Sequence, residues 1–300
     1  PTYNNDKTIK AVVEKSLLYC DDVIVVADGC TDDTMDILHD IDKITLVSYP
    51  QNKGKGYALK VGFRKALDKG FSYAITLDGD GQHYPENIPL FLKANQKHPH
   101  ALIVGSRQLD GVCRSKGSSF ANKFSNFWFY VQTGKALDDT QTGYRLYPLH
   151  KLYGLLFLTS RYEAELELLV FASWHGVKIV PISVQVYYPP REERVSHFRP
   201  TKDFVRISVL NTVLCFLAIV YGLPLRLWRF FTSCLQTVYS LLFFLFFTLV
   251  VFTPFVWIYT KVGKMTEKKR YRLHQLIYFA SRFVMIHHGI PGTKFLSKVA

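Results

Sequence analysis

Residues 21–49 read DDVIVVADGCTDDTMDILHDIDKITLVSY and show two buried strands with a helix between them. The runs at 21–28 and 43–49 are rich in Val, Ile and Leu, which predicts strands covered on both faces. The polar residues between them predict a helix. Strands joined in this way are typical of a parallel sheet in an α/β fold.

The same alternation continues on the C-terminal side. Further strands are predicted at 71–81, 101–107 and 177–186, and helices at 52–70, 85–97, 118–133 and 164–176. Ligands of mainly parallel sheets bind beyond the carboxyl ends of strands. Asp28, Asp78, Asp80 and Arg107 each follow a predicted strand, so we expect them to share one site.

The chain divides into three parts by composition. Residues 1–200 have the mixed charge of a globular domain, residues 201–260 are strongly apolar, and residues 261–300 are basic and helical in pattern. The segment 235–259 carries no charge and exceeds the roughly 20 residues that a spanning helix needs. The shorter segment 207–225 can span, re-enter or lie in the interface. We expect a juxtamembrane stretch followed by a transmembrane hairpin.

The net charge of +13 favours an anionic partner. No nucleic-acid-binding motif is present, so nucleic acid is not expected as a partner. Basic residues flank the apolar part at 191–206 and 261–272, which suits lipid headgroups. The five cysteines form no CxxC pair and no metal spacing, which indicates a reducing compartment.

The segment DGDGQ at 78–82 is the sharpest chemical signal. Two carboxylates separated by one residue at a strand end project to the same side. Such oxygen ligands bind Mg²⁺ or Mn²⁺, and the bound cation would also coordinate a diphosphate. The alternative is an acidic turn without a bound metal. Gly54 and Gly56 complete neither a P-loop nor a GxGxxG motif. They are expected to let the backbone approach a ligand closely, with Lys53 or Lys55 near phosphate.

Six short motifs occur in a recognisable order: PTYN at 1–4, DGCTD at 28–32, NKGKGYA at 52–58, DGDGQH at 78–83, GSR at 105–107, and Asp139 with GYR at 143–145. In order and spacing, residues 1–200 resemble inverting family 2 glycosyltransferases with the GT-A fold. Within that family the chain is most similar to dolichol-phosphate mannosyltransferases and polyprenyl-phosphate glycosyltransferases. The strand that this fold has before Pro1 is missing from the sequence.

The resemblance implies a role for each matching position. The nucleotide-sugar is expected at Pro1, Tyr3, Asn5, Asp28, Lys55 and Asp78, the cation at Asp78, Asp80 and Gln82, and the acceptor phosphate at Arg107, Arg114, Ser118, Arg191 and Ser196. Asn5, Ala27 and Cys30 depart from the family's usual Glu, Asp and Ser, which leaves the base open. Arg194 and His197 replace a glycine and a lysine, which leaves the acceptor contact of that loop open.

The implied chemistry depends on the acceptor. A lipid phosphate is largely ionised near neutral pH and needs arginines rather than a base. A hydroxyl acceptor needs a base, for which Asp139 is the best candidate unless it orients Arg145. Asp80, Asp139 and Arg107 are therefore the expected catalytic residues.

The sequence thus predicts a membrane-anchored enzyme of a bacterial inner membrane, with its catalytic domain in the cytosol. It would move a mannose- or glucose-type hexose from a nucleotide-sugar to polyprenyl or dolichyl phosphate, in envelope glycoconjugate synthesis. A different lipid or glycan hydroxyl acceptor and a non-catalytic scaffold are the alternatives, and homo-oligomerisation is open. Residues 261–300 weakly resemble the approach to lysophospholipid acyltransferase domains, but they lack the His-x4-Asp motif.

Overall fold

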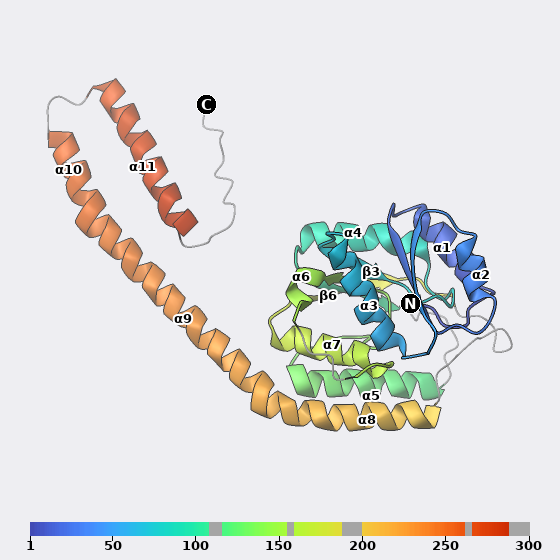
Figure 1. Cartoon of the computed structure of the whole chain (residues 1–300). Coiled ribbons are helices and arrows are strands. Elements are labelled where there is room, and N and C mark those ends of the chain that lie inside the picture. The colour runs from blue at the N-terminus through green and yellow to red at the C-terminus, as the bar shows by residue number, and fades with distance from the viewer. Residues whose placement is uncertain (108–115, 155–158, 188–199, 262–265, 288–300) are drawn as a thin grey trace. The chain divides into compact units, whose positions relative to one another are not determined.

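The computed structural model describes residues 1–107, 116–154, 159–187, 200–261 and 266–287, without the side chains of 116–120, 200–202, 248, 251 and 280–287. The chain forms two compact units, residues 1–226 and residues 227–300. The first unit is an α/β domain with helices packed around two small sheets (Figure 1).

The strands fall close to the predicted positions. Strands β1 (Val23–Asp28) and β2 (Ile44–Tyr49) pair in parallel. A second sheet has the order β3-β5-β4-β6, formed by β3 (Tyr73–Thr76), β5 (Arg145–Pro148), β4 (Leu102–Arg107) and β6 (Ile179–Val184). Only β5 runs opposite to the other strands of this sheet. Sequence analysis missed β5, because four residues ending in proline are too short to show a period.

One helix of the domain is buried along its whole length. The helices before the apolar segment are α1 (Ile9–Leu17), α2 (Thr34–His39), α3 (Lys55–Asp68), α4 (Ile88–Lys97) after a 3-10 turn at Pro85–Asn87, α5 (Lys116–Thr133), α6 (Leu149–Leu152) and α7 (Glu163–Trp174). All residues of α7 are buried. They contact α3, α5 and the following helix α8 (Pro200–Leu217) (Figure 1). This burial matters because α7 carries three glutamates.

A cavity of about 360 Å³ lies between the two sheets, lined mainly by apolar side chains of β1, α3 and β3. Thr2 forms a parallel bridge to Ala27 of β1 at one end of this space. The strand expected before Pro1 stays a prediction.

The apolar segment differs from the predicted hairpin. Helix α8 continues through a π-helical stretch (Ala218–Gly222) into α9 (Leu223–Phe246), then through a second π stretch (Phe247–Phe252) into α10 (Thr253–Lys261). A hairpin built from 207–225 and 235–259 needs a turn at 226–234, and α9 covers these residues without interruption. Helix α11 (Glu267–His287) follows.

The first membrane candidate, 207–225, packs on the domain. Leu210, Asn211 and Leu214 of α8 are buried, and the Asn211 side chain accepts a hydrogen bond from Gln132 of α5 at 3.0 Å. Among the described residues, one helix, Asp203–Phe246, is long and apolar enough to cross a membrane, and an 18-residue window within it has a mean hydropathy of 2.0. The segment 207–225 thus contacts the domain through part of its surface, and whether it spans, re-enters or lies in the interface stays a prediction.

Candidate active site

The carboxyl end of β1 is fixed to the loop before α3. The carboxylate of Asp28 accepts hydrogen bonds from the backbone N–H groups of Lys53 at 2.7 Å and Gly54 at 2.8 Å. Gly29 has a φ of +69°, and a Cβ there would lie 2.3 Å from the backbone nitrogen of Asn52. The close approach of these two segments therefore requires glycine.

Residues 1–8 connect β1 with the DGDGQ segment. The Thr2 N–H donates to the Val26 carbonyl, and the Thr8 hydroxyl donates to the Gly79 carbonyl at 2.6 Å. A Cβ on Gly79 would lie 2.7 Å from the Thr2 hydroxyl and 3.2 Å from the amide nitrogen of Asn5. The predicted nucleotide residues Pro1, Tyr3 and Asn5 therefore belong to a segment that lies against Gly79.

Asp78 is paired with a lysine. Its Oδ1 lies 2.7 Å from the Lys55 ammonium, whose second partner is Glu165 Oε2 at 2.9 Å. Burial alone would raise the pKa of Asp78, but the Lys55 charge lowers it to about 2. The same two carboxylates raise the pKa of Lys55 against the effect of burial. Lys55, predicted to lie near phosphate, instead sits between two carboxylates.

The pKa of Asp80 is shifted in the opposite direction to that of Asp78. Burial and the neighbouring Asp78 charge raise the pKa of Asp80 to about 6, although its Oδ1 accepts the Gln82 backbone N–H at 3.0 Å. Two carboxylates that repel each other in this way fit a divalent cation, which would relieve the repulsion.

The described residues contain no group of three or more His, Cys, Asp and Glu side chains that could hold a metal ion. Mg²⁺ is usually held by one or two carboxylates together with substrate phosphates, so the pair fits that mode of binding. The backbone N–H of Gln82 donates to the Asp80 carboxylate, and the backbone carbonyl of Gln82 accepts a hydrogen bond from the Tyr187 N–H. Asp78 and Asp80 would hold the cation, and the role of the Gln82 side chain stays a prediction.

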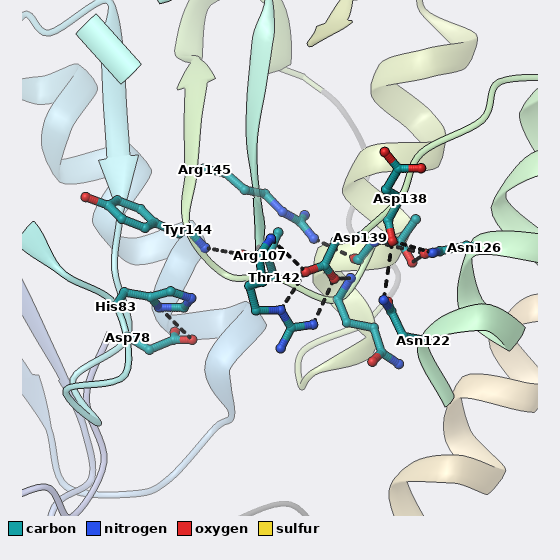
Figure 2. A network of polar contacts seen from close by, with 12 residues as sticks. Asp78, His83, Arg107, Asn122, Asn126, Asp138, Asp139, Thr142, Tyr144 and Arg145 are labelled. Atoms are coloured by element: carbon teal, nitrogen blue, oxygen red, sulfur yellow. Dashed lines mark hydrogen bonds and ion pairs between the residues drawn. The ribbon is translucent and has the colours of Figure 1, made fainter. Parts of the chain in front are cut away.

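His83 is buried beside this pair. Its Nδ1 lies 3.9 Å from Asp78 Oδ2 and its ring packs on Tyr144 (Figure 2). Burial lowers the pKa of His83 to about 4 even though the Asp78 charge opposes the shift, so the ring is neutral at pH 7. Nδ1 is buried and has no hydrogen-bond partner. Sequence analysis did not assign His83 a role, although it stands in the DGDGQH motif.

Arg107 and Asp139 form a bidentate pair (Figure 2). Arg107 donates from Nε to Asp139 Oδ2 at 2.5 Å and from its NH2 group to Oδ1 at 2.8 Å. The Gln141 N–H also donates to Oδ1, at 3.2 Å. Asp139 is only 2% exposed. Both of its oxygens are therefore occupied, and its arginine partner is Arg107 rather than Arg145.

Helix α5 holds the loop that carries Asp139. The amides of Asn122 and Asn126 both donate to the Asp138 carbonyl, and Asn126 accepts the Thr140 N–H at 3.0 Å (Figure 2). Arg145 is fully buried and donates to the Thr140 carbonyl at 2.8 Å and to the Glu165 carbonyl at 2.7 Å. The loop is thus fixed by α5 on one side and by α7 on the other.

Several predicted acceptor residues lie outside the part of the chain that the structure describes. Arg114, Arg191 and Ser196 fall in residues that the structure does not describe, and Ser118 belongs to α5 without a described side chain. Their roles stay predictions. Sequence reasoning also missed Glu163 and Glu165, which are both buried. Three acidic residues in an otherwise apolar helix are a signal that could have found them, since buried carboxylates are rare.

Comparison with known proteins identifies the family. Residues 1–145 match the sequence model described as Glycosyl transferase family 2. One relative is the UDP-N-acetylglucosamine--dolichyl-phosphate N-acetylglucosaminyltransferase of Methanococcus voltae, 28% identical over 211 residues, which cover 63% of this chain and 84% of the relative. Another is the polyprenol monophosphomannose synthase of Mycolicibacterium smegmatis, 30% identical over 161 residues, which cover 49% and 59%.

The fold is also found among solved structures. The glucosyl-3-phosphoglycerate synthase of Mycobacterium tuberculosis, in a crystal structure with UDP, superposes with a TM-score of 0.54 at 19% identity, over 72% of this chain and 78% of that one. The architecture is that of a GT-A-like α/β domain. The chain belongs to glycosyl transferase family 2, and its relatives include polyprenyl- and dolichyl-phosphate glycosyltransferases. The family resemblance and the fold class expected from the sequence are confirmed.

Proposed function

We propose that this glycosyltransferase moves a mannose- or glucose-type hexose from a nucleotide-sugar to polyprenyl or dolichyl phosphate, with inversion at the anomeric carbon. The observation that carries this proposal is the pairing of Asp139 with Arg107 through both carboxylate oxygens. Two relatives whose names include dolichyl phosphate and polyprenol monophosphomannose support the same acceptor class.

The pairing argues against a hydroxyl acceptor activated by Asp139. A general base must be within hydrogen-bond reach of the proton that it removes. Asp139 is buried and already accepts hydrogen bonds on both oxygens, so taking up a proton would break its pair with Arg107. A phosphate monoester has a second pKa of about 6 and attacks without a base.

Arg107 then acts by presenting the acceptor. A planar guanidinium can donate two parallel hydrogen bonds to phosphate oxygens, and Asp139 fixes the plane of the Arg107 guanidinium. Arg114 and Arg191 would add cationic contacts, and Ser118 and Ser196 would add hydroxyl donors. These four roles rest on the family resemblance alone.

The donor side is proposed to use Asp78 and Asp80. A bound Mg²⁺ or Mn²⁺ would neutralise charge that develops on the leaving diphosphate. Asp28 and residues 1–5 would hold the base and ribose, since Thr2 and Asn5 lie against Gly79 of the same segment and the Asp28 N–H donates to the Thr2 carbonyl. Neutral His83 packs behind Asp78 and adds no charge to it.

The proposed location follows from the two substrates. Nucleotide-sugars are cytosolic and polyprenyl phosphates are membrane-bound, so they meet at the membrane surface. The helix Asp203–Phe246 is apolar enough to anchor the domain there. We therefore place the catalytic domain on the cytosolic side, in a bacterial inner membrane.

The test uses a matched pair of acceptors. Membranes that contain the protein are incubated with labelled GDP- and UDP-sugars and either polyprenyl phosphate or the same polyprenol without phosphate. We expect labelled lipid only with the phosphate, and loss of the label with EDTA or with Asp80→Ala. Equal labelling of the free polyprenol, or labelling of diacylglycerol instead, would overturn the proposed acceptor.

A hydroxyl acceptor is the second candidate because another carboxylate could serve as the base. Glu163 Oε2 is buried and has no hydrogen-bond partner. If Glu163 is the base, Glu163→Gln abolishes transfer to a hydroxyl acceptor, whereas transfer to polyprenyl phosphate would survive it. A non-catalytic scaffold predicts no turnover with any acceptor, and nucleotide binding by Asp80→Ala equal to that of the parent.

A further inference from the structure

Helix α7 carries a buried carboxylate that the proposed function does not use. Glu165 is 6% exposed, and its Oε2 lies 2.9 Å from the Lys55 ammonium. Its Oε1 is buried without a hydrogen-bond partner. A buried carboxylate is costly unless it is paired, and an unpaired oxygen adds to that cost. Such a group in a helix core points to a role beyond packing.

Lys55 is shared between Glu165 and Asp78. Its single positive charge faces Asp78 Oδ1 at 2.7 Å and Glu165 Oε2 at 2.9 Å. The backbone of Gly143 covers this group so closely that a Cβ would lie 2.7 Å from both the Lys55 ammonium and Asp78 Oδ2. The backbone of Gly143 therefore limits the positions open to the Lys55 ammonium and the Asp78 carboxylate.

Glu165 also fixes the acceptor side. Its backbone carbonyl accepts a hydrogen bond from Arg145, whose NH2 group donates to Thr140, the residue next to Asp139. One position of α7 thus contacts two buried cations, Lys55 on the donor side of the site and Arg145 of β5, which binds the loop that carries Asp139.

The charge balance gives Glu165 a consequence for cation binding. If Lys55 had only Asp78 as a partner, its charge would cancel that of Asp78 and would repel a divalent cation. With Glu165 present, the group Lys55, Asp78 and Glu165 carries a net charge of −1. We propose that Glu165 is a positioning residue that holds Lys55 between two carboxylates, so that Asp78 and Asp80 keep their attraction for a divalent cation. This inference rests on the proposed cation site.

The experiment measures Mn²⁺ affinity in the purified full chain, with and without nucleoside diphosphate, from the EPR signal of free Mn²⁺ at pH 7.5. We expect Glu165→Gln to weaken Mn²⁺ binding about ten-fold, because one negative charge is removed near the site. We expect Lys55→Met to change it in the opposite direction, towards tighter binding. Glu167→Gln is the matched control, since Glu167 is a buried carboxylate of the same helix that binds Thr159 instead.

A purely structural role gives a different pattern. It predicts that Glu165→Gln and Glu167→Gln lower the melting temperature alike and leave the Mn²⁺ affinity at the parent value, which would overturn the inference. Weaker binding in both Glu165→Gln and Lys55→Met would overturn it as well. If Lys55→Met does not fold, the comparison of the two glutamine variants still decides. A parent chain that binds no Mn²⁺, with or without nucleoside diphosphate, refutes the proposed cation site itself.

Discussion

Asp139→Asn separates a base from a positioning residue. The substitution keeps the size of the side chain and removes the charge that binds the Arg107 fork at 2.5 and 2.8 Å. Asp139 is almost fully buried, and breaking such a pair on one side typically costs about 3–5 kcal/mol. Because an amide oxygen can still accept one hydrogen bond, we expect a loss of about 2–3 kcal/mol in the free energy of unfolding.

The effect on catalysis follows from the freed guanidinium. With Arg107 no longer held in its plane, we expect kcat/KM for polyprenyl phosphate to fall about 100-fold, which corresponds to about 2.7 kcal/mol of transition-state stabilisation. Arg107→Lys keeps the positive charge but loses the fork, and it should fall by a similar factor. Initial rates at saturating nucleotide-sugar, together with urea unfolding, measure both quantities.

The pH–rate profile decides between the two roles. If Asp139 only positions Arg107, Asp139→Asn lowers the whole profile between pH 6 and 9 without changing its shape. If Asp139 is the base, the variant loses the acidic limb of the profile. A variant with at least half of the parent kcat/KM and unchanged stability would refute the assignment of either role.

Three further predictions concern other parts of the domain. Burial and the Asp78 charge raise the pKa of Asp80 from 3.8 to about 6, so the metal-free protein should lose stability as the pH rises from 4 to 6. Asp80→Asn should therefore stabilise the protein by up to about 2 kcal/mol at pH 7 in thermal melts with EDTA. An unchanged or lower melting temperature of this variant would contradict the prediction. Gly143→Ala should lower the free energy of unfolding by about 1–3 kcal/mol and the activity at least ten-fold, because the new Cβ would lie 2.7 Å from Asp78 Oδ2. A variant with the parent rates would disprove this close approach. Arg226 donates a hydrogen bond to the Thr133 carbonyl at the C-terminal end of α5, at 2.7 Å. Arg226→Gln should therefore destabilise the domain by about 1–2 kcal/mol, while the Mn²⁺ affinity stays constant. Equal unfolding curves of variant and parent would argue against a stabilising role of this hydrogen bond.

The strands at 23–28, 44–49, 73–76 and 102–107 were predictable because each is a short apolar run bounded by polar residues or glycine. The site motifs were predictable because they stand where those runs end. Strand β5 and the continuous helix through 226–234 were not predictable in the same way. A four-residue strand has no measurable period, and the hairpin was expected because residues 226–234 separate two apolar segments of the sequence.

The sequence by itself determined the α/β class, the family and the order of the acidic and basic motifs, because hydrophobic period and motif spacing are local properties of the chain. Only the tertiary structure decided which charges meet. Asp139 binds Arg107 rather than Arg145, and Lys55 lies between Asp78 and Glu165 rather than open to phosphate. These partners are 23 to 110 residues apart in the chain, and their pairing depends on how β3, β4, α3 and α7 pack together. In a buried site, the charge that each group presents to a ligand is set by such neighbours.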